Sequence, residues 1–190
     1  MEWLQRSPRR TVVMKVMTKP KITSEIHEEA LNGVVSLSNT SEILKSLREE
    51  GLIVCINPKE KTGKLYGLTK EGKAIRNKTY PHEPAYQDIS KKIVKEYAYV
   101  IRGKHRRAVI KVMSDRKTPS RIHKHVLRSS ENLPPDSINY VRLSLNSTSD
   151  TLRGFRKKSI AICINKEKRV GRLYDLTKKG KAIREQILKE

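Results

Sequence analysis

The chain contains an internal repeat that covers most of its length. The fourteen residues GKLYGLTKEGKAIR at 63–76 return, nearly unchanged, as GRLYDLTKKGKAIR at 171–184. Nearer the amino terminus, RTVVMKVM at 10–17 matches RRAVIKVM at 106–113. The first pair is separated by 108 positions and the second by 96, so the second copy holds twelve extra residues. Because a duplication sets the number of folding units, the sequence predicts two copies of one domain.

The domain boundaries are expected where the repeat breaks off. The first domain is assigned to residues 1–77 and the second to residues 90–190. Residues 78–89 lie between them and contain Pro81 and Pro84, a composition that resists regular structure. This segment is interpreted as a linker.

The second copy is expected to differ from the first in two places. A helical apolar stripe predicts a leading helix over 90–103, capped by Ser90 and ended by Gly103. The twelve extra residues fall at 128–140, where Pro, Ser, Asn and Asp predict a loop.

Apolar spacing predicts three helices in each copy. In the first copy they are expected around 12–16, after a cap at Thr23 or Ser24, and after a cap at Ser38. Gly51 is expected to end the third helix, because glycine readily adopts the left-handed conformation common at helix ends.

A hairpin and a closing helix are predicted next. The runs at 52–57 and 64–68 are rich in β-forming residues, and a charged turn at 58–63 joins them. Thr69 is expected to cap the last helix. The sequence therefore predicts an α+β, mostly helical chain with this order of elements in each of two domains.

This order, with a basic hairpin directly after the third helix, resembles the winged helix-turn-helix domain of archaeal and bacterial transcription regulators of the MarR and ArsR kind. The resemblance is carried by the third-helix phrase at 38–54 and by LYGLTKEGKAI at 65–75, with counterparts at 146–162 and 173–183. It implies two tandem winged-helix domains, in which the third helix recognises DNA and the hairpin forms the wing.

The charge of the chain indicates an anionic partner. It has 42 Lys and Arg against 20 Asp and Glu, a net charge of +22. Residues 1–77 hold 14 basic and 9 acidic residues, whereas residues 78–190 hold 28 and 11. No apolar run approaches the roughly 18 residues that span a bilayer, and the amino terminus lacks a signal segment. A cytoplasmic protein that binds nucleic acid, without membrane contact, is therefore expected.

The exposed face of each third helix is the candidate recognition surface. Thr40, Leu44 and Leu47 share one face and are expected to point into the core. In the major groove, Asn can pair with adenine and Arg with guanine. The helix residues assigned to DNA are Asn39 and Lys45 in the first copy, and Ser147, Arg153, Arg156 and Lys157 in the second.

Basic hairpin turns and the start of the second copy supply further candidates. Such residues suit contacts with phosphates or with the minor groove. They are Lys59, Lys61 and Lys64 in the first hairpin, Lys166, Lys168, Arg169 and Arg172 in the second, and Arg106 and Arg107 in the run 102–107 that opens the second copy's first helix. Solvated surface charge is the alternative interpretation of each run.

Four residues depart from the expected pattern. The carboxylates of Glu42 and Asp150 are repelled by phosphates but can accept from a cytosine amino group, so capping or surface roles stay open. Gly154 interrupts the second copy's third helix, and Ser159 follows it where the family usually has glycine. A less regular third helix is expected there.

The sequence predicts no catalytic, metal or cofactor site. Cys55 and Cys163 occupy equivalent positions and are interpreted as core residues rather than a redox pair. His123 and His125 lack partners at a zinc spacing. Neither a carboxylate constellation for acid–base chemistry nor a phosphate-cradling glycine loop is found. An enzyme is not expected.

The favoured function is binding of double-stranded DNA, as a transcription regulator or a nucleoid-associated, chromatin-type factor. The alternative is a protein-interaction module that recruits transcription or replication machinery, in which only the second domain touches nucleic acid. RNA binding is a third hypothesis, weakened by the 5% aromatic content. Apolar surface on the helix at 90–101 and around Trp3 leaves homodimerisation open.

Overall fold

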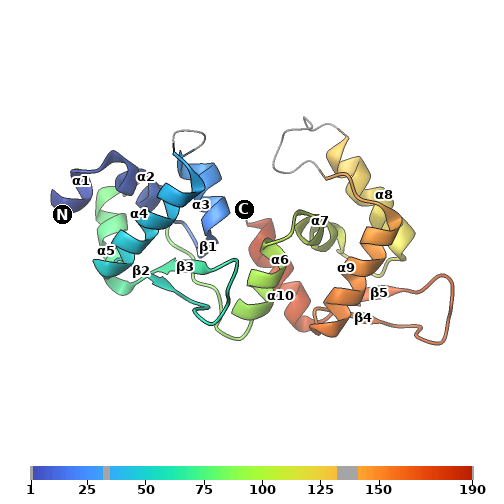
Figure 1. The fold of residues 1–190 in the computed structure, drawn as a ribbon. Coiled ribbons are helices and arrows are strands. Elements are labelled where there is room, and N and C mark those ends of the chain that lie inside the picture. The colour runs from blue at the N-terminus through green and yellow to red at the C-terminus, as the bar shows by residue number, and fades with distance from the viewer. Residues whose placement is uncertain (1, 32–34, 132–140, 190) are drawn as a thin grey trace. The chain divides into compact units, whose positions relative to one another are not determined.

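The computed structural model describes residues 2–31, 35–131 and 141–189. They divide into two compact units, unit 1 (residues 1–94) and unit 2 (residues 95–190). The prediction of an α+β, mostly helical chain is confirmed, and the small sheets are antiparallel (Figure 1).

The described part of unit 1 orders its elements as the repeat predicts, with a short strand and a short helix added. Its helices are α1 (Glu2–Gln5), α2 (Pro8–Val16), α3 (Thr23–Leu31), α4 (Leu37–Glu49) and α5 (Lys70–Thr79). Its strands are β1 (Lys21–Ile22), β2 (Ile53–Cys55) and β3 (Leu65–Leu68), in the sheet order β1-β3-β2.

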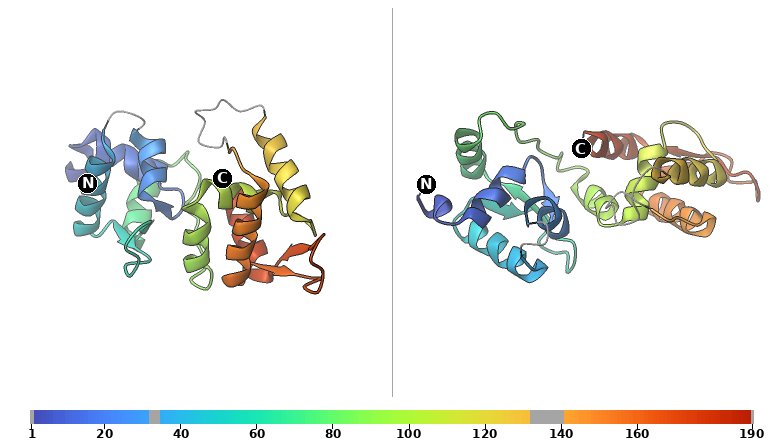
Figure 2. Two further views of the ribbon diagram at one scale, coloured as in Figure 1. Left: turned by 45° about the vertical axis from the view of Figure 1, so that its right-hand side comes forward. Right: turned by 90° about the horizontal axis from the view of Figure 1, so that it is seen from above.

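The described part of unit 2 follows the same order. Its helices are α6 (Val94–Ile101), α7 (Lys104–Val112), α8 (Pro119–Ser130), α9 (Leu145–Lys157) and α10 (Lys178–Leu188), and its strands are β4 (Ala161–Cys163) and β5 (Tyr174–Leu176). The equivalent of β1 is reduced to a single bridge between Lys117 and Tyr174. Figures 1 and 2 show the β4–β5 hairpin extending beyond the helices of its unit.

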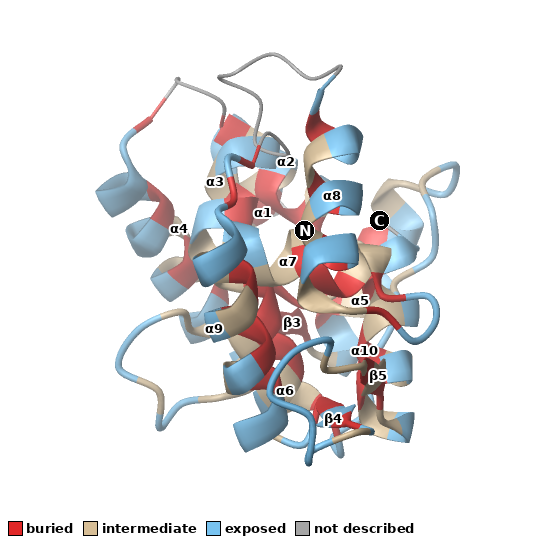
Figure 3. Ribbon diagram, turned by 90° about the vertical axis from the view of Figure 1, so that its right-hand side faces the viewer, coloured by how far each residue is buried: buried red, intermediate tan, exposed pale blue. Residues whose placement is uncertain are grey.

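Each unit has its own apolar core. The fully buried side chains include Val13, Met14, Ile26, Leu44 and Leu47 in unit 1, and Val109, Ile110, Ile122, Leu152 and Phe155 in unit 2 (Figure 3). They recur at helical spacing on the inward faces of α2, α3 and α4 in unit 1 and of α7, α8 and α9 in unit 2. The burial of each side chain contributes about 1.5–3 kcal/mol to stability. The third helix is thereby fixed with its opposite face exposed.

The repeated phrase fastens the closing helix of unit 1. The Thr69 hydroxyl accepts from the Gly72 N–H (3.0 Å) and donates to the Gly51 carbonyl (2.7 Å). A Cβ at Gly72 would lie 2.0 Å from the Leu52 carbonyl oxygen, so only glycine allows this approach. The buried Arg76 donates from Nη2 to the Lys15 carbonyl at the end of α2 (3.1 Å).

Unit 2 makes the same contacts with the equivalent residues. Thr177 accepts from the Gly180 N–H (3.1 Å) and donates to the Ser159 carbonyl (2.8 Å). A Cβ at Gly180 would lie 2.1 Å from a carbonyl oxygen, and Arg184 donates from Nε to the Lys111 carbonyl (3.0 Å). The fourteen-residue phrase is therefore repeated because it joins the closing helix to the hairpin and to the first helix.

Two predicted helix caps are wrong. The residue that caps α4 is Ser36, whose hydroxyl accepts from the Asn39 N–H (3.2 Å), and Ser38 lies inside the helix. Similarly, α3 already begins at Thr23, because the strand β1 runs directly into it. The backbone N–H of Ile22 is satisfied by the Glu25 carboxylate (3.1 Å) instead of by a threonine or serine.

The third helix of the second copy is more regular than expected. It is continuous through Gly154 and as long as α4. Gly154 serves close packing, since a Cβ there would lie 2.4 Å from the Tyr99 hydroxyl of α6. Ser159 adopts a left-handed conformation (φ +55°) at the position that Gly51 occupies in unit 1 (φ +70°).

The segment interpreted as a linker differs from the prediction. The helix α5 continues to Thr79, and the residues after it pack on unit 1, where Tyr86 accepts from the Leu68 N–H (3.1 Å). The helix predicted over 90–103 is shorter in the structure, where α6 begins at Val94 and ends at Ile101.

The loop predicted at 128–140 also begins later than expected. The helix α8 continues to Ser130. Most of the predicted loop, residues 132–140, lies outside the described residues.

The repeat begins earlier than the sequence comparison placed it. The Arg10 guanidinium lies over the Trp3 ring of α1 at 3.8 Å, and Arg106 lies over the Tyr99 ring of α6 at 4.1 Å. Both pairs are 96 positions apart. The helix α6 is therefore the counterpart of α1.

Candidate nucleic-acid interface

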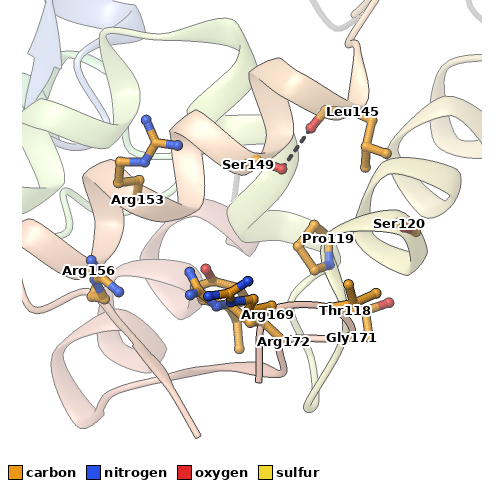
Figure 4. Close-up of a pocket in the computed structure, with 12 residues that line it drawn as sticks. Thr118, Pro119, Ser120, Leu145, Ser149, Arg153, Arg156, Arg169, Gly171 and Arg172 are labelled. Atoms are coloured by element: carbon orange, nitrogen blue, oxygen red, sulfur yellow. Dashed lines mark hydrogen bonds between the residues drawn. The ribbon is translucent and has the colours of Figure 1, made fainter. Parts of the chain in front are cut away.

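A groove of about 450 Å³ in unit 2 brings together three elements that are separate in the sequence (Figure 4). Its lining residues come from the start of α8 (Thr118, Pro119, Ser120), from α9 (Leu145, Ser149, Arg153, Arg156) and from the hairpin (Arg169, Val170, Gly171, Arg172, Tyr174). Four of them are arginines and none is acidic. The groove therefore presents a concentrated positive charge.

The helix α9 contributes one exposed stripe to the groove. Leu145, Ser149, Arg153 and Arg156 recur every three or four residues and so share one face of the helix. The buried residues of α9 lie on its other side and anchor it to the core. At its start, Ser144 accepts from the Ser147 N–H (3.0 Å), which satisfies a backbone donor left open at the helix end.

The hairpin turn is built around one asparagine. Asn165 donates from Nδ2 to the Gly171 carbonyl (3.1 Å), and its Oδ1 accepts from the Leu173 N–H (2.6 Å). Gly171 permits the turn because its φ is +70°, where a side chain would be strained. This bracing holds the exposed Arg169 at the edge of the groove.

The four arginines differ in how they are held. Arg153 pairs with Asp150 at 3.1 Å, with both side chains more than 60% exposed. Arg172 is half-buried and donates from Nε to the Lys168 carbonyl (2.9 Å). Within the described residues, Arg156 and Arg169 form no ion pair. These two guanidinium groups can therefore meet a phosphate without first losing an acidic partner.

A buried, ion-paired lysine lies beside the hairpin. Lys117 lies next to Tyr174 and pairs with Asp115. Burial lowers the pKa of Lys117, and the nearby Arg184 charge lowers it further. The equivalent Lys21 pairs with Glu29, so both copies hold a lysine at this position against the returning strand.

Unit 1 carries cations at the same four positions. Lys45, Arg48, Lys61 and Lys64 occupy the positions of Arg153, Arg156, Arg169 and Arg172. Its turn is braced in the same way, since Asn57 donates to the Gly63 carbonyl (3.2 Å) and accepts from the Leu65 N–H (2.6 Å). Lys45 is 3.9 Å from Glu49, an acid that unit 2 replaces with Lys157.

The remaining predicted residues are scattered over the surface. Asn39 is exposed in the first turn of α4, and Lys157 is exposed at the end of α9. Lys59 is exposed on the hairpin turn of unit 1. Lys166 and Lys168 are exposed on the hairpin turn of unit 2, near in sequence to Arg169 and Arg172, which line the groove. Ser147 is half-buried, and its hydroxyl accepts from that of Ser144 (2.9 Å), so it mainly supports the start of α9.

Two predicted arginines lie outside the groove. Arg106 stacks on Tyr99, and its Nε is buried without a hydrogen-bond partner among the described residues. It lines a second hollow of about 400 Å³ together with Asp150, away from the groove. Arg107 is half-buried in the same helix and does not line the groove. The structure thus unites four of the predicted cations and gives Arg106 a packing role.

Several groove residues were missed by the sequence analysis. Arg48, the unit 1 counterpart of the groove residue Arg156, was missed as well and could have been found from the repeat. Leu145 is an exposed apolar residue at the start of α9, and its equivalent Leu37 is exposed as well. No sequence signal brings Thr118 and Ser120 to the groove, since only the packing of α8 on α9 places them there.

The cysteines and two of the histidines, His27 and His123, pack within their units, whereas His125 is exposed. Cys163 is buried and Cys55 half-buried, and both thiols are free. His123 bonds through Nε2 to the Leu143 carbonyl (2.7 Å), and the equivalent His27 contacts the Thr40 hydroxyl (3.0 Å). Across residues 2–31, 35–131 and 141–189, no group of His, Cys, Asp and Glu could hold a metal ion. No helix in these ranges has the length and apolar character needed to cross a membrane.

The chain was compared with models of protein families, with curated proteins and with solved structures, and none of them matches it.

Proposed function

We propose that the chain binds double-stranded DNA through two tandem winged helix-turn-helix domains, as a transcription regulator or a chromatin-associated factor. The observation that carries the proposal is the acid-free groove lined by Arg153, Arg156, Arg169 and Arg172. In this arrangement unit 2 forms the principal interface, because it combines that groove with most of the net charge of the chain.

We assign different tasks to the two sides of the groove. The exposed stripe of α9 fits the major groove, with Leu145 and Ser149 nearest the base edges, where an apolar side chain can meet a thymine methyl. The hairpin turn fits the phosphate backbone, since Arg169 is exposed on a braced loop and Arg172 lines the groove beside it. Phosphate contacts set the register and base contacts set the sequence preference.

Unit 1 is proposed to bind DNA in the same way, with lower affinity. Its four equivalent positions are cationic, but α4 and the residue after it also carry exposed Glu42, Glu49 and Glu50. Negative charge so close to the candidate surface weakens attraction to phosphates. Joining the two units on one chain raises the effective concentration of the second contact once the first has formed.

The proposal is tested by matched double substitutions in the full-length chain. Arg156→Ala with Arg169→Ala removes two groove cations from unit 2, and Arg48→Ala with Lys61→Ala removes the equivalent pair from unit 1. Titration of mixed-sequence duplex DNA should show a loss of about 100-fold for the first pair. The salt slope of log K should also fall by about 2, because two phosphate contacts are lost.

The control removes equal charge from the exposed outer side of α8, through Lys124→Ala with Arg128→Ala. Its effect on affinity should be less than about five-fold, since neither residue lines the groove. Equal losses for all three pairs would show that only net charge matters. Intact affinity of the unit 2 pair would overturn the proposal and favour the protein-interaction alternative.

A further inference from the structure

The outer face of each hairpin is the side opposite the helical core. In unit 1 strand pairing places Val54 beside Gly67, and the two-residue period of the strands adds Ile56 and Leu65 to the same face. The corresponding residues of unit 2 are Ile162, Asp175, Ile164 and Leu173.

In unit 1 the outer face is covered around Gly67 by the strap, defined as residues 81–90, while Val54 stays exposed. The Tyr86 hydroxyl lies 2.7 Å from where a Cβ of Gly67 would be, and it accepts from the Leu68 N–H (3.1 Å). At the edge of the face, Lys73 pairs with Asp88 at 2.5 Å and lies 4.9 Å from the centre of the Tyr86 ring. The strap therefore binds through an aromatic side chain and a carboxylate.

The chemistry of the strap is simple. Its sequence PHEPAYQDIS contains two acidic residues and neither lysine nor arginine, and all ten residues are described and form neither helix nor strand. Its backbone also engages unit 1, because the Gln87 N–H donates to the Thr18 carbonyl (2.7 Å) and Arg76 donates to the Pro84 carbonyl (2.9 Å). The strap is thus an extended, acidic peptide that belongs to the same chain.

In unit 2 the same face is open. Ile164 is 41% exposed, whereas its equivalent Ile56 is half-buried. Ile162 and its equivalent Val54 are both exposed, so the difference between the units lies at Ile164 and Leu173. Leu65 is fully buried in unit 1, but its equivalent Leu173 is only partly buried. Lys181 takes the position of Lys73 and is exposed. Unit 2 therefore keeps the apolar and cationic parts of the site, exposed to solvent.

We propose that the outer face of the β4–β5 hairpin binds an extended, acidic peptide segment of a partner protein, in the manner in which the strap covers unit 1. An apolar side chain of the partner packs on Ile164 and Leu173, and a carboxylate of the partner pairs with Lys181. The basic hairpin turn strengthens the attraction for an acidic segment. The outer face is distinct from the groove, because Leu173 and Asp175 alternate along the strand with Arg172 and Tyr174, which line the groove. Only the basic turn is shared with the proposed DNA interface.

Asp175 restricts which side chain the partner segment can place against the hairpin. Its Oδ1 accepts from the Leu176 N–H (2.8 Å), which is the bond that Tyr86 makes in unit 1, and Arg116 lies 3.5 Å from its other oxygen. A side chain at this position excludes a tyrosine placed like Tyr86, because the Cβ would meet its hydroxyl. The partner segment is therefore expected to have a smaller apolar residue there.

The test uses two labelled peptides and the full-length chain. One peptide has the strap sequence PHEPAYQDIS, and the other carries Tyr86→Leu. Fluorescence anisotropy should show saturable binding of the Tyr86→Leu peptide, weakened about ten-fold by Ile164→Glu and by Lys181→Glu through repulsion or loss of the ion pair. Asp175→Gly should strengthen binding of the tyrosine peptide about ten-fold, because it restores the glycine of unit 1.

The matched control is Val54→Glu in unit 1, which adds the same charge at an equally exposed hairpin position and should leave peptide binding unchanged. Absence of saturable binding, or equal binding of a scrambled peptide, would overturn the inference. If Ile164→Glu instead shifted a monomer–dimer equilibrium toward the monomer, the outer face would bind a second copy of the chain. If the variants weakened DNA binding and no peptide bound, the outer face would bind nucleic acid. DNA titration of the same variants keeps failure of this inference separate from failure of the proposed function.

Discussion

Units 1 and 2 share one internal framework but differ in surface charge. Five glutamates of unit 1 correspond to lysines at the equivalent positions of unit 2: Glu28 and Lys124, Glu49 and Lys157, Glu50 and Lys158, Glu60 and Lys168, Glu71 and Lys179. The asparagine-braced turn and the contacts of the closing helix are nevertheless the same in both. The fold therefore does not require the charge difference, and the two surfaces are free to serve different partners.

The largest expected effect tests the shared framework. Gly72→Ala and Gly180→Ala should each destabilise their own unit by about 3 kcal/mol, because the added Cβ meets a backbone carbonyl that cannot easily move. Calorimetric unfolding of the full chain measures the shift. Ala74→Gly, at an exposed position of the same helix, is the control and should cost only about 1 kcal/mol. A neutral Gly72→Ala would contradict the packing role of the repeated phrase.

The next largest expected effect is a loss of stability of unit 1 at high pH. Burial raises the pKa of Tyr86 to about 12, although its bond from the Leu68 N–H acts in the opposite direction. Because the folded-state pKa lies above the unfolded value, the stabilisation is complete below pH 10 and is lost as the pH rises through about 12. Unit 1 should lose about 2 kcal/mol over this range. Unfolding of the wild type and of Tyr86→Phe, followed against pH, gives the comparison, and an equal loss in both would contradict it.

A smaller effect concerns one backbone N–H that has a different acceptor in each unit. Tyr86→Phe leaves the Leu68 N–H without its acceptor, and Asp175→Ala does the same for the Leu176 N–H. Each change should cost its own unit about 1 kcal/mol at neutral pH. Hydrogen exchange at the two amides reports the loss locally. If Asp175→Ala changed neither exchange nor stability, Asp175 would not be the substitute for Tyr86.

The smallest effect concerns the end of the third helix. Ser159→Gly should stabilise unit 2 by about 0.5 kcal/mol, because its φ of +55° suits glycine better than serine. Gly51→Ser should destabilise unit 1 by a similar amount, and chemical denaturation of both variants measures the pair. Opposite signs are required, so a loss in both variants would argue against backbone strain at this turn.

Much of the framework could be predicted because it depends on local patterns. The inward stripe of Thr40, Leu44 and Leu47 and the threonine cap of the closing helix are visible in the sequence, and the repeat supports each of them twice. The Ser36 cap was missed because Ser38 offered an equally good local signal. The strand β1 was missed because it has only two residues, too few for a periodic pattern.

The strap and half of the groove could not be predicted, because they depend on contacts between distant segments. Pro81 and Pro84 indicate only that residues 81–90 are not helical, and nothing in their composition shows that Tyr86 packs on β3. The basic character of the third helix and hairpin was clear from the sequence. The stacking of Arg106 on Tyr99 was not, because it required recognising α6 as the counterpart of α1.

The glycine at position 67 and the aspartate at position 175 also have a genetic meaning. A glycine codon that ends in a pyrimidine becomes an aspartate codon through one base substitution at its second position. One such change supplies the acceptor for the buried amide and makes a covering segment unnecessary. At this position, therefore, the exchange of one residue replaces an acceptor supplied by the strap with an acceptor supplied by the strand itself.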